Sequence, residues 1–216
     1  MQAFEIHTPQ TAPAGSADIL SAIAERNRFL PNVFAVLGGS TPALAAFATL
    51  NEQFGQSSLS PIEREIVQTA ARVQNEGAYC VAGHSAFTDF QELDTSEIAA
   101  VRTGAVLADP RHQALRVFAE SLVRTRGRHA GADVSAFLAA GYQIDQVFDV
   151  VLGVCVKMFS NIASGVADIP LDDAFAPFEW SPSEVSGPGD AALPGPILDV
   201  GTFEVLRDHW REPKSL

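Results

Sequence analysis

The segment Ser60–Phe90 has the pattern of two short helices joined by a tight turn, and this pattern constrains the fold of the chain most. Its first residues, Ser60-Pro61-Ile62-Glu63, are a helix start: a capping hydroxyl, a proline at the first helical position and a capping-box glutamate. Apolar residues then recur at helical spacing as far as the turn signal Asn75-Glu76-Gly77. A second helix is predicted to begin near Ala78 and to continue through Phe87 or beyond.

Three side chains of this segment suggest a nucleophilic site. Cys80 and His84 are four residues apart, so they share one face of the second helix, and Glu65 lies on the first helix. A helix N-terminus and a nearby imidazole both favour the reactive thiolate form of cysteine. We predict Cys80 as the nucleophile, His84 as its base and Glu65 as the group that orients His84. Tyr79, next to Cys80, is expected to shape the substrate pocket or to donate a hydrogen bond there. A contact between Glu65 and His84 requires that the two helices pack as an antiparallel pair with Glu65 facing inward.

The same residues also fit a purely structural role. A cysteine in an apolar helix is usually a small buried side chain, and a histidine one turn later often lies at the edge of the core. The other cysteine, Cys155, stands between Val154 and Val156 and is expected to be a core residue. Alternatively, it is a distant resolving thiol for Cys80, which would require Cα atoms no more than about 7 Å apart.

The segment resembles the core of the carboxymuconolactone decarboxylase superfamily and, within it, the AhpD-like alkylhydroperoxidases. Their motif is a glutamate on one helix, a Cys-x-x-Cys pair at the start of the next, and a histidine one turn after the second cysteine. Glu65, Cys80 and His84 match these positions. The later run Lys157–Phe175 also resembles the end of the core in peroxidase-related members. The resemblance implies an all-α, AhpD-like helical bundle, reduction of a hydroperoxide by a cysteine thiolate, and assembly into a homo-oligomer.

Gly77 stands where the first cysteine of the motif is expected. Neighbouring residues therefore cannot close a disulfide after a peroxide is reduced, and an external thiol reductant is expected to restore Cys80. Two alternatives stay open. One is a cofactor-independent, decarboxylase-type enzyme in which His84 and Glu65 do acid–base work on a small organic acid and Cys80 only lines the pocket. The other is a catalytically degenerate, oligomeric scaffold.

The rest of the chain predicts one helical domain with less regular ends. Residues 1–15 are interpreted as an N-terminal arm, 16–180 as the AhpD-like helical domain, and 181–216 as a Pro/Gly-rich linker and tail. No strand–turn–strand signal occurs. The apolar run 144–158 is long for a strand and is predicted to be a buried helix.

Composition excludes several classes of function. The net charge of −12 argues against a nucleic-acid partner, because binding phosphates requires clustered cations. There is no glycine-rich dinucleotide motif, phosphate-binding loop or zinc-ligand cluster, so we predict no metal and no organic cofactor. The sequence has no uninterrupted apolar run of membrane-spanning length and no signal-peptide pattern at its start, so we expect a cytoplasmic protein without a membrane partner.

Overall fold

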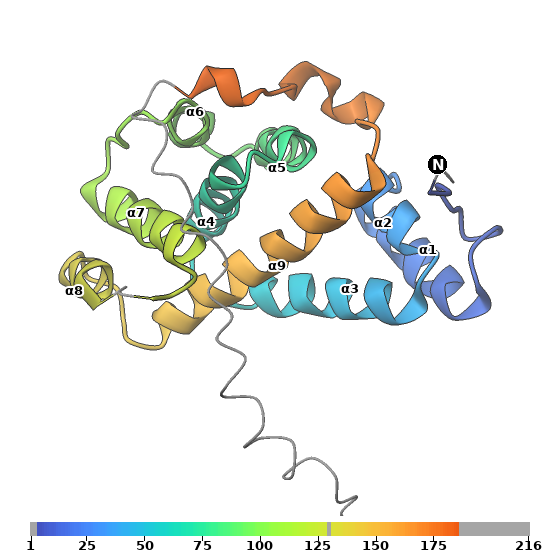
Figure 1. The fold of residues 1–216 in the computed structure, drawn as a ribbon, viewed down its shortest axis with the longest axis horizontal. Helices are drawn as coiled ribbons and strands as arrows, with labels where there is room; N and C mark the ends of the chain where they lie inside the picture. Colours follow the sequence, from blue (N-terminus) through green and yellow to red (C-terminus); the bar gives the residue numbers. More distant parts are fainter. Residues whose placement is uncertain (1–3, 129–130, 186–216) are drawn as a thin grey trace, which may run out of the picture.

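The computed structural model describes residues 4–128 and 131–185, and within these residues every regular element is helical (Figure 1). The all-α prediction is therefore confirmed. The elements in chain order are α1 (Ala14–Asn27), α2 (Asn32–Leu37), α3 (Thr41–Gly55), α4 (Pro61–Gln74), α5 (Ala78–Phe90), α6 (Thr95–Thr103), α7 (Pro110–Thr125), α8 (Gly131–Ala139), α9 (Gln146–Ala167) and the short 3-10 helices η1 (Asp173–Phe178) and η2 (Pro182–Glu184). Most of the proposed linker and tail, residues 186–216, lies outside the described residues.

Helix α4 lies at the centre of the bundle and packs against α5, α6, α7 and α9 (Figure 1). It begins with the predicted capping box: the Ser60 hydroxyl accepts a hydrogen bond from the Glu63 N–H, and the Glu63 carboxylate accepts one from the Ser60 N–H. Almost every residue of α4 after its first turn is buried. Its polar residues are therefore held inside the protein, where they need partners.

Helix α5 follows α4 after a turn in which Glu76 has a positive φ of 52°. Gly77 is the N-cap residue of α5, and the helix runs to Phe90 as the sequence predicts. Helices α4 and α5 pack against each other as a hairpin. The predicted helix pair is therefore present, and it brings the first turn of α5 beside the last turns of α4.

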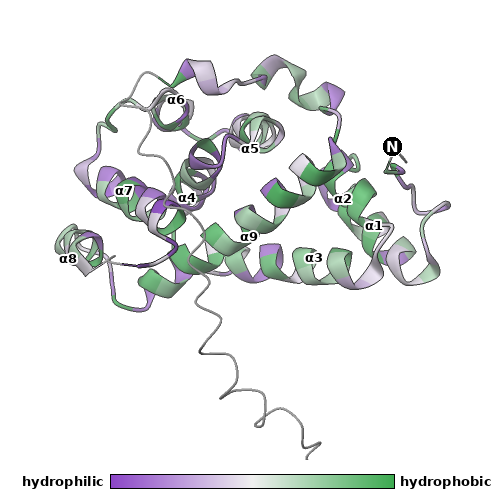
Figure 2. Cartoon of the chain, in the orientation of Figure 1, coloured by the Kyte–Doolittle hydropathy of each residue, from purple (hydrophilic) through white to green (hydrophobic). Residues whose placement is uncertain are grey.

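Helix α9 crosses the bundle and packs against α3, α4, α5 and α7. Figure 2 shows that it is hydrophobic along most of its length. Gly153 permits a close approach to α3 and α4, because a Cβ atom there would lie 2.6 Å from two ring carbons of Phe54 and 2.8 Å from Val67. The prediction of a buried helix is only partly right: one face of α9 is buried, whereas Phe148 is 73% exposed. By length and composition alone α9 could also cross a membrane, a test that the core helix of a bundle passes as well.

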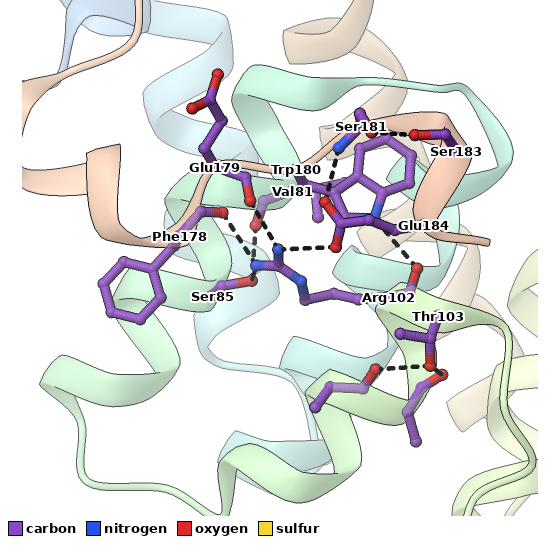
Figure 3. Close-up of polar contacts among 12 residues, drawn as sticks. Val81, Ser85, Arg102, Thr103, Phe178, Glu179, Trp180, Ser181, Ser183 and Glu184 are labelled. Atoms are coloured by element: carbon purple, nitrogen blue, oxygen red, sulfur yellow. Dashed lines mark hydrogen bonds and ion pairs between the residues drawn. The ribbon is translucent and has the colours of Figure 1, made fainter.

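The segment after α9 folds back over α5 and α6. Its anchor is Arg102 in α6, which donates hydrogen bonds to the Ser85 hydroxyl and to the carbonyl oxygens of Phe178 and Glu179, at 2.8 to 3.0 Å (Figure 3). The Trp180 indole N–H donates in return to the Arg102 carbonyl. These bonds hold η1 against α5, where it closes one side of the cavity described next.

Candidate functional site

A cavity of about 350 Å³ lies among α3, α4, α5, α9 and η1. This volume is at the lower end of the range for small-molecule sites. Five phenylalanines contribute to its wall: Phe34, Phe47, Phe54, Phe87 and Phe175. The polar lining comes mainly from side chains of α4, α5 and α9, with Arg26 and Asn27 of α1 and Asn51 of α3. Within the described residues no group of three or more His, Cys, Asp or Glu side chains is arranged to hold a metal ion.

Glu65 and His84 meet as the sequence predicts. The His84 Nδ1 atom lies 2.7 Å from the Glu65 carboxylate, and both side chains line the cavity. Glu65 faces inward from α4, and only 10% of its side chain is exposed. The antiparallel packing of α4 and α5 therefore forms the carboxylate–imidazole pair on which the predicted site depends.

Lys157 extends this pair into a chain of three groups, and sequence reasoning missed it. Its Nζ atom lies 3.0 Å from His84 Nε2, and the residue is 3% exposed. A signal was present in the sequence. The protein has only two lysines against twelve arginines, and Lys157 is the one charged residue between Asp149 and Asp168 in a largely apolar helix. A rare cation in such a position calls for a buried partner.

Burial keeps His84, the middle one of these three groups, uncharged. Burial, the Arg72 charge and Lys157 lower the pKa of His84 well below its usual range, so the imidazole is neutral near neutral pH. Burial and Arg72 also lower the pKa of Lys157 well below its usual range. The tautomer that satisfies both partners has the His84 Nδ1–H donating to Glu65, while Nε2 accepts from Lys157.

Arg72 supplies a buried positive charge next to Glu65, His84 and Lys157. It is fully buried on α4, and its Nη2 atom donates to Gln68 at 3.1 Å. Its Nε and Nη1 atoms have no hydrogen-bond partner among the described residues. Burial lowers its pKa to about 10, and the neighbouring Cys80 and Glu65 oppose that shift, so Arg72 stays charged at neutral pH. Burial raises the pKa of Glu65, and the Arg72 and Lys157 charges act against that rise.

Cys80 lines the same cavity but contacts a different helix from the one expected. It is 6% exposed, and its Sγ atom lies 3.8 Å from the hydroxyls of both Ser160 and Ser164 on α9. No hydrogen bond joins it to His84, because the two ring nitrogens already face Glu65 and Lys157. The sequence predicts direct proton transfer from Cys80 to His84. The observed geometry does not place the two groups for this transfer.

Cys155 is exposed, so the expectation of a core cysteine is wrong. It lies on α9 five residues before Ser160 and nine before Ser164. These offsets place it about 140° and about 180° around the helix from the two residues that contact Cys80. Cys155 therefore points away from Cys80, and the structure does not support it as an internal resolving thiol.

Tyr79 lines the cavity, but its hydroxyl is already used. It donates to the Asp172 carboxylate at 2.6 Å and accepts from the Val33 N–H at 3.1 Å. Burial and the hydrogen bond to Asp172 raise the pKa of Tyr79 far above its usual range, so it stays neutral. Its hydroxyl therefore ties α5 to α2 and to the segment after α9, which leaves the ring to shape the cavity.

The position of the absent first cysteine is occupied from α9. A Cβ atom on Gly77 would lie 2.9 Å from the Asn161 amide oxygen and 3.2 Å from its nitrogen. Neither amide atom of Asn161 has a hydrogen-bond partner among the described residues, although both are buried. The side chain of Asn161 thus fills the space next to Gly77.

No protein-family model and no curated relative matches the chain. Solved structures do match. An uncharacterized peroxidase-related protein with an alkylhydroperoxidase AhpD core, from Ralstonia eutropha JMP134, is 21% identical, with a TM-score of 0.70 over 80% of this chain and 93% of that one. An uncharacterized peroxidase-related protein from Silicibacter sp. TM1040 is 19% identical, with a TM-score of 0.69 over 81% and 92% of the two chains.

A third similar structure is the debrominase Bmp8, as a cysteine-to-alanine variant in complex with 2,3,4-tribromopyrrole. It is 13% identical and has a TM-score of 0.70 over 82% of this chain and 96% of that one. Identities this low establish architecture rather than chemistry. The similarity to these structures over about 80% of the chain identifies it as one with the AhpD-like all-α fold.

Proposed function

We propose that the protein is a thiol-dependent reductase of small organic hydroperoxides, with Cys80 as the reacting group. One observation carries the proposal: Cys80 lines a cavity that also contains the chain Glu65–His84–Lys157. A thiol, an acid–base system and space for a substrate therefore occur together. The likeness to peroxidase-related structures supports the same reaction class. The phenylalanine wall favours an organic hydroperoxide over hydrogen peroxide, because apolar surface stabilises an alkyl group.

The proposed step is a displacement at oxygen. The Cys80 thiolate attacks the hydroxyl oxygen of the hydroperoxide, so that an S–O bond forms while the O–O bond breaks. The alkoxide leaves with the bonding electron pair and takes a proton to become an alcohol. Cys80 is oxidised to a sulfenic acid. Arg72, which is fully buried on α4, keeps a positive charge close to Cys80 during this step.

Recovery of Cys80 requires two molecules of an external thiol. The first condenses with the sulfenic acid and releases water, which leaves a mixed disulfide, and the second displaces Cys80 as a thiol. Gly77 and the outward-facing Cys155 leave no internal alternative among the described residues. The external reductant is thus a required partner of the proposed reaction.

The two cysteines provide a direct test, because solvent exposure and activation of the thiol make opposite predictions about which cysteine reacts first. Cys155 is exposed and Cys80 is 6% exposed, so access alone would oxidise Cys155 first. We expect the reverse: brief treatment with cumene hydroperoxide and a sulfenic-acid trap should label Cys80 at least ten times faster than Cys155. Labelling is measured by peptide mass, with Cys155→Ser and Cys80→Ser as matched variants. Equal rates, or faster labelling of Cys155, would refute the proposal.

A second candidate is an acid–base enzyme that acts on a small organic acid without using the thiol. The observation that favours it is that Glu65, His84 and Lys157 are joined to each other by hydrogen bonds that do not include Cys80. Arg26 and Arg64 also line the cavity and carry the charge that would attract a carboxylate. Turnover of a small acid that survives Cys80→Ser and is lost in His84→Ala would support this candidate.

A further inference from the structure

We propose that Lys157 is the catalytic residue that takes the proton from Cys80 and returns it to the leaving alkoxide. The inference rests on the proposed hydroperoxide reduction and assigns its proton transfers to a residue that the cysteine–histidine–glutamate motif does not contain. It changes the role of His84 as well, from the base itself to the group that holds the base.

The first step is geometric exclusion of the other bases at the site. The two nitrogens of His84 face Glu65 and Lys157, so no free lone pair of the ring faces the sulfur. The Glu65 carboxylate accepts from His84. Arg72 remains protonated at neutral pH and cannot accept a proton. Lys157 is the remaining group of this cluster that can both accept and give one.

The second step is the placement of Lys157 relative to the sulfur. Lys157, Ser160 and Ser164 are separated by three and four residues, so they share one face of α9. The two serines contact the Cys80 sulfur, and Lys157 lies one turn before Ser160. Lys157 and Cys80 line the same cavity. A substrate bound in this cavity therefore lies between walls that include both the sulfur and the amine.

The third step is the charge state of the amine. The titratable and charged groups around it are Cys80 and His84 on α5 and Glu65 and Arg72 on α4. Burial and Arg72 favour the neutral amine, whereas an ionised Cys80 and Glu65 favour the ammonium. The surroundings of the amine therefore favour its neutral form before the proton transfer, and a negative sulfur beside it favours the ammonium afterwards.

The proton that Cys80 loses then stays within the site until the alkoxide takes it. Cys80 gives its proton to the Lys157 amine, which forms a thiolate–ammonium pair. The thiolate attacks the hydroxyl oxygen of the hydroperoxide, and the S–O bond forms while the O–O bond breaks. The ammonium gives its proton to the departing alkoxide, so an alcohol leaves and the amine is neutral again. His84 and Glu65 act as positioning residues, because the amine donates to the His84 Nε2 lone pair and Glu65 fixes the ring.

Two substitutions separate the roles of base and charge. Lys157→Met removes both, and we expect single-turnover oxidation of Cys80 by cumene hydroperoxide to slow by about 10²–10³-fold, as for the loss of a positioned general acid–base. Lys157→Arg keeps a positive charge that cannot be given up. Alkylation of Cys80 by iodoacetamide should therefore persist in this variant at neutral pH, while its oxidation by hydroperoxide slows. Arg126→Met, which removes an exposed cation at the end of α7, is the control variant and should react like the parent.

The pH profile and the folding equilibrium exclude a merely structural role. A lysine whose pKa is lowered by folding binds fewer protons in the native than in the unfolded state, so it destabilises the protein below its unfolded pKa, and stability rises with pH above the native value. We expect the urea midpoint of the parent to rise between pH 7 and about 9, and that of Lys157→Met to be higher at pH 7 and flatter across this range. The pH dependence of Cys80 alkylation should change in the same variant.

Each outcome decides one point. If Lys157→Met oxidises within about threefold of the parent, the proposal is wrong. If the variant is slow but less stable than the parent at pH 7, Lys157 is structural and the proposal is also wrong. If parent Cys80 fails to react with hydroperoxide at all, the proposed function fails. The alkylation experiment then still decides, on its own, whether Lys157 is the base of Cys80.

Discussion

Installing the absent first cysteine tests whether the backbone at the start of α5 still supports a two-cysteine mechanism. Gly77 has a φ of −82°, which any residue adopts, so the backbone does not require glycine there. Residues 77 and 80 lie one helical turn apart, which places their Cα atoms about 5 Å from each other and within disulfide range. We expect Gly77→Cys to form a disulfide with Cys80 after one equivalent of hydroperoxide.

The obstacle is the Asn161 side chain, and its size follows from the contact distances. A Cβ atom on residue 77 would lie 2.9 Å from the Asn161 amide oxygen, so this amide must move by several tenths of an ångström. It is the end of a flexible side chain and makes no hydrogen bond in the described structure. We therefore place the cost at the lower end of the usual range for overpacking, about 1 kcal/mol. Removing the amide with Asn161→Ala should recover most of this cost in the double variant, a coupling that a double-mutant cycle measures.

Intact mass separates the possible products. The parent should gain about 16 Da as a sulfenic acid, whereas Gly77→Cys should lose about 2 Da as a disulfide. Gly77→Ser is the matched control, because its side chain has a similar volume but no thiol. A serine variant destabilised by more than about 3 kcal/mol would refute the estimate of the Asn161 contact. A cysteine variant that folds but gains oxygen without closing the disulfide would refute the proximity of the two positions.

Two further predictions concern the helices that hold the site. Gly153→Ala should destabilise the protein by about 3 kcal/mol in urea unfolding, because its Cβ would lie 2.6 Å from the rigid Phe54 ring, whereas Gly165→Ala on the same helix, with open space around it, should stabilise it by about 0.5–1 kcal/mol. A Gly153 variant as stable as the parent would contradict the close packing of α9. Tyr79→Phe should cost about 1–3 kcal/mol, because buried Asp172 loses a hydrogen bond, while the rate of Cys80 oxidation in the folded protein changes little. A large loss of rate at unchanged stability would instead show that the Tyr79 hydroxyl takes part in the reaction.

Local patterns were sufficient to predict the helices around the site. The capping box at Ser60, the turn before Ala78 and the spacing of apolar residues lie within a few residues of each other, and each is determined by short-range hydrogen bonding. The Glu65–His84 contact was predictable for a related reason, because two helices joined by so short a turn pack as neighbours. The homo-oligomer and the cytoplasmic location stay predictions.

The roles of residues on α9 could not be predicted in the same way. Whether Cys155 faces the core or solvent depends on which stripe of an almost uniformly apolar helix is buried, and its sequence pattern does not distinguish the stripes. Lys157 and His84 are 73 positions apart in the sequence, yet their side chains are in contact. The contact depends on how α9 crosses α4 and α5, which is a property of the whole bundle. Only the rarity of lysine in the chain pointed to this residue.

The packing of α9 and the chemistry of the cavity depend on the same stripe of side chains. Gly153 lies one turn before Lys157, so both are on the face that α9 presents to α4 and α5. The missing side chain at Gly153 brings α9 close enough for Phe54 and Val67 to pack against it. A methyl group there would press α9 away from Phe54 on α3 and Val67 on α4, and the 3.0 Å hydrogen bond between Lys157 and His84 weakens when its two atoms move apart. The glycine is therefore expected to set the reach of the lysine as well as the stability of the bundle. A Gly153→Ala protein that still folds should, for this reason, show the slowed Cys80 oxidation that is expected of Lys157→Met.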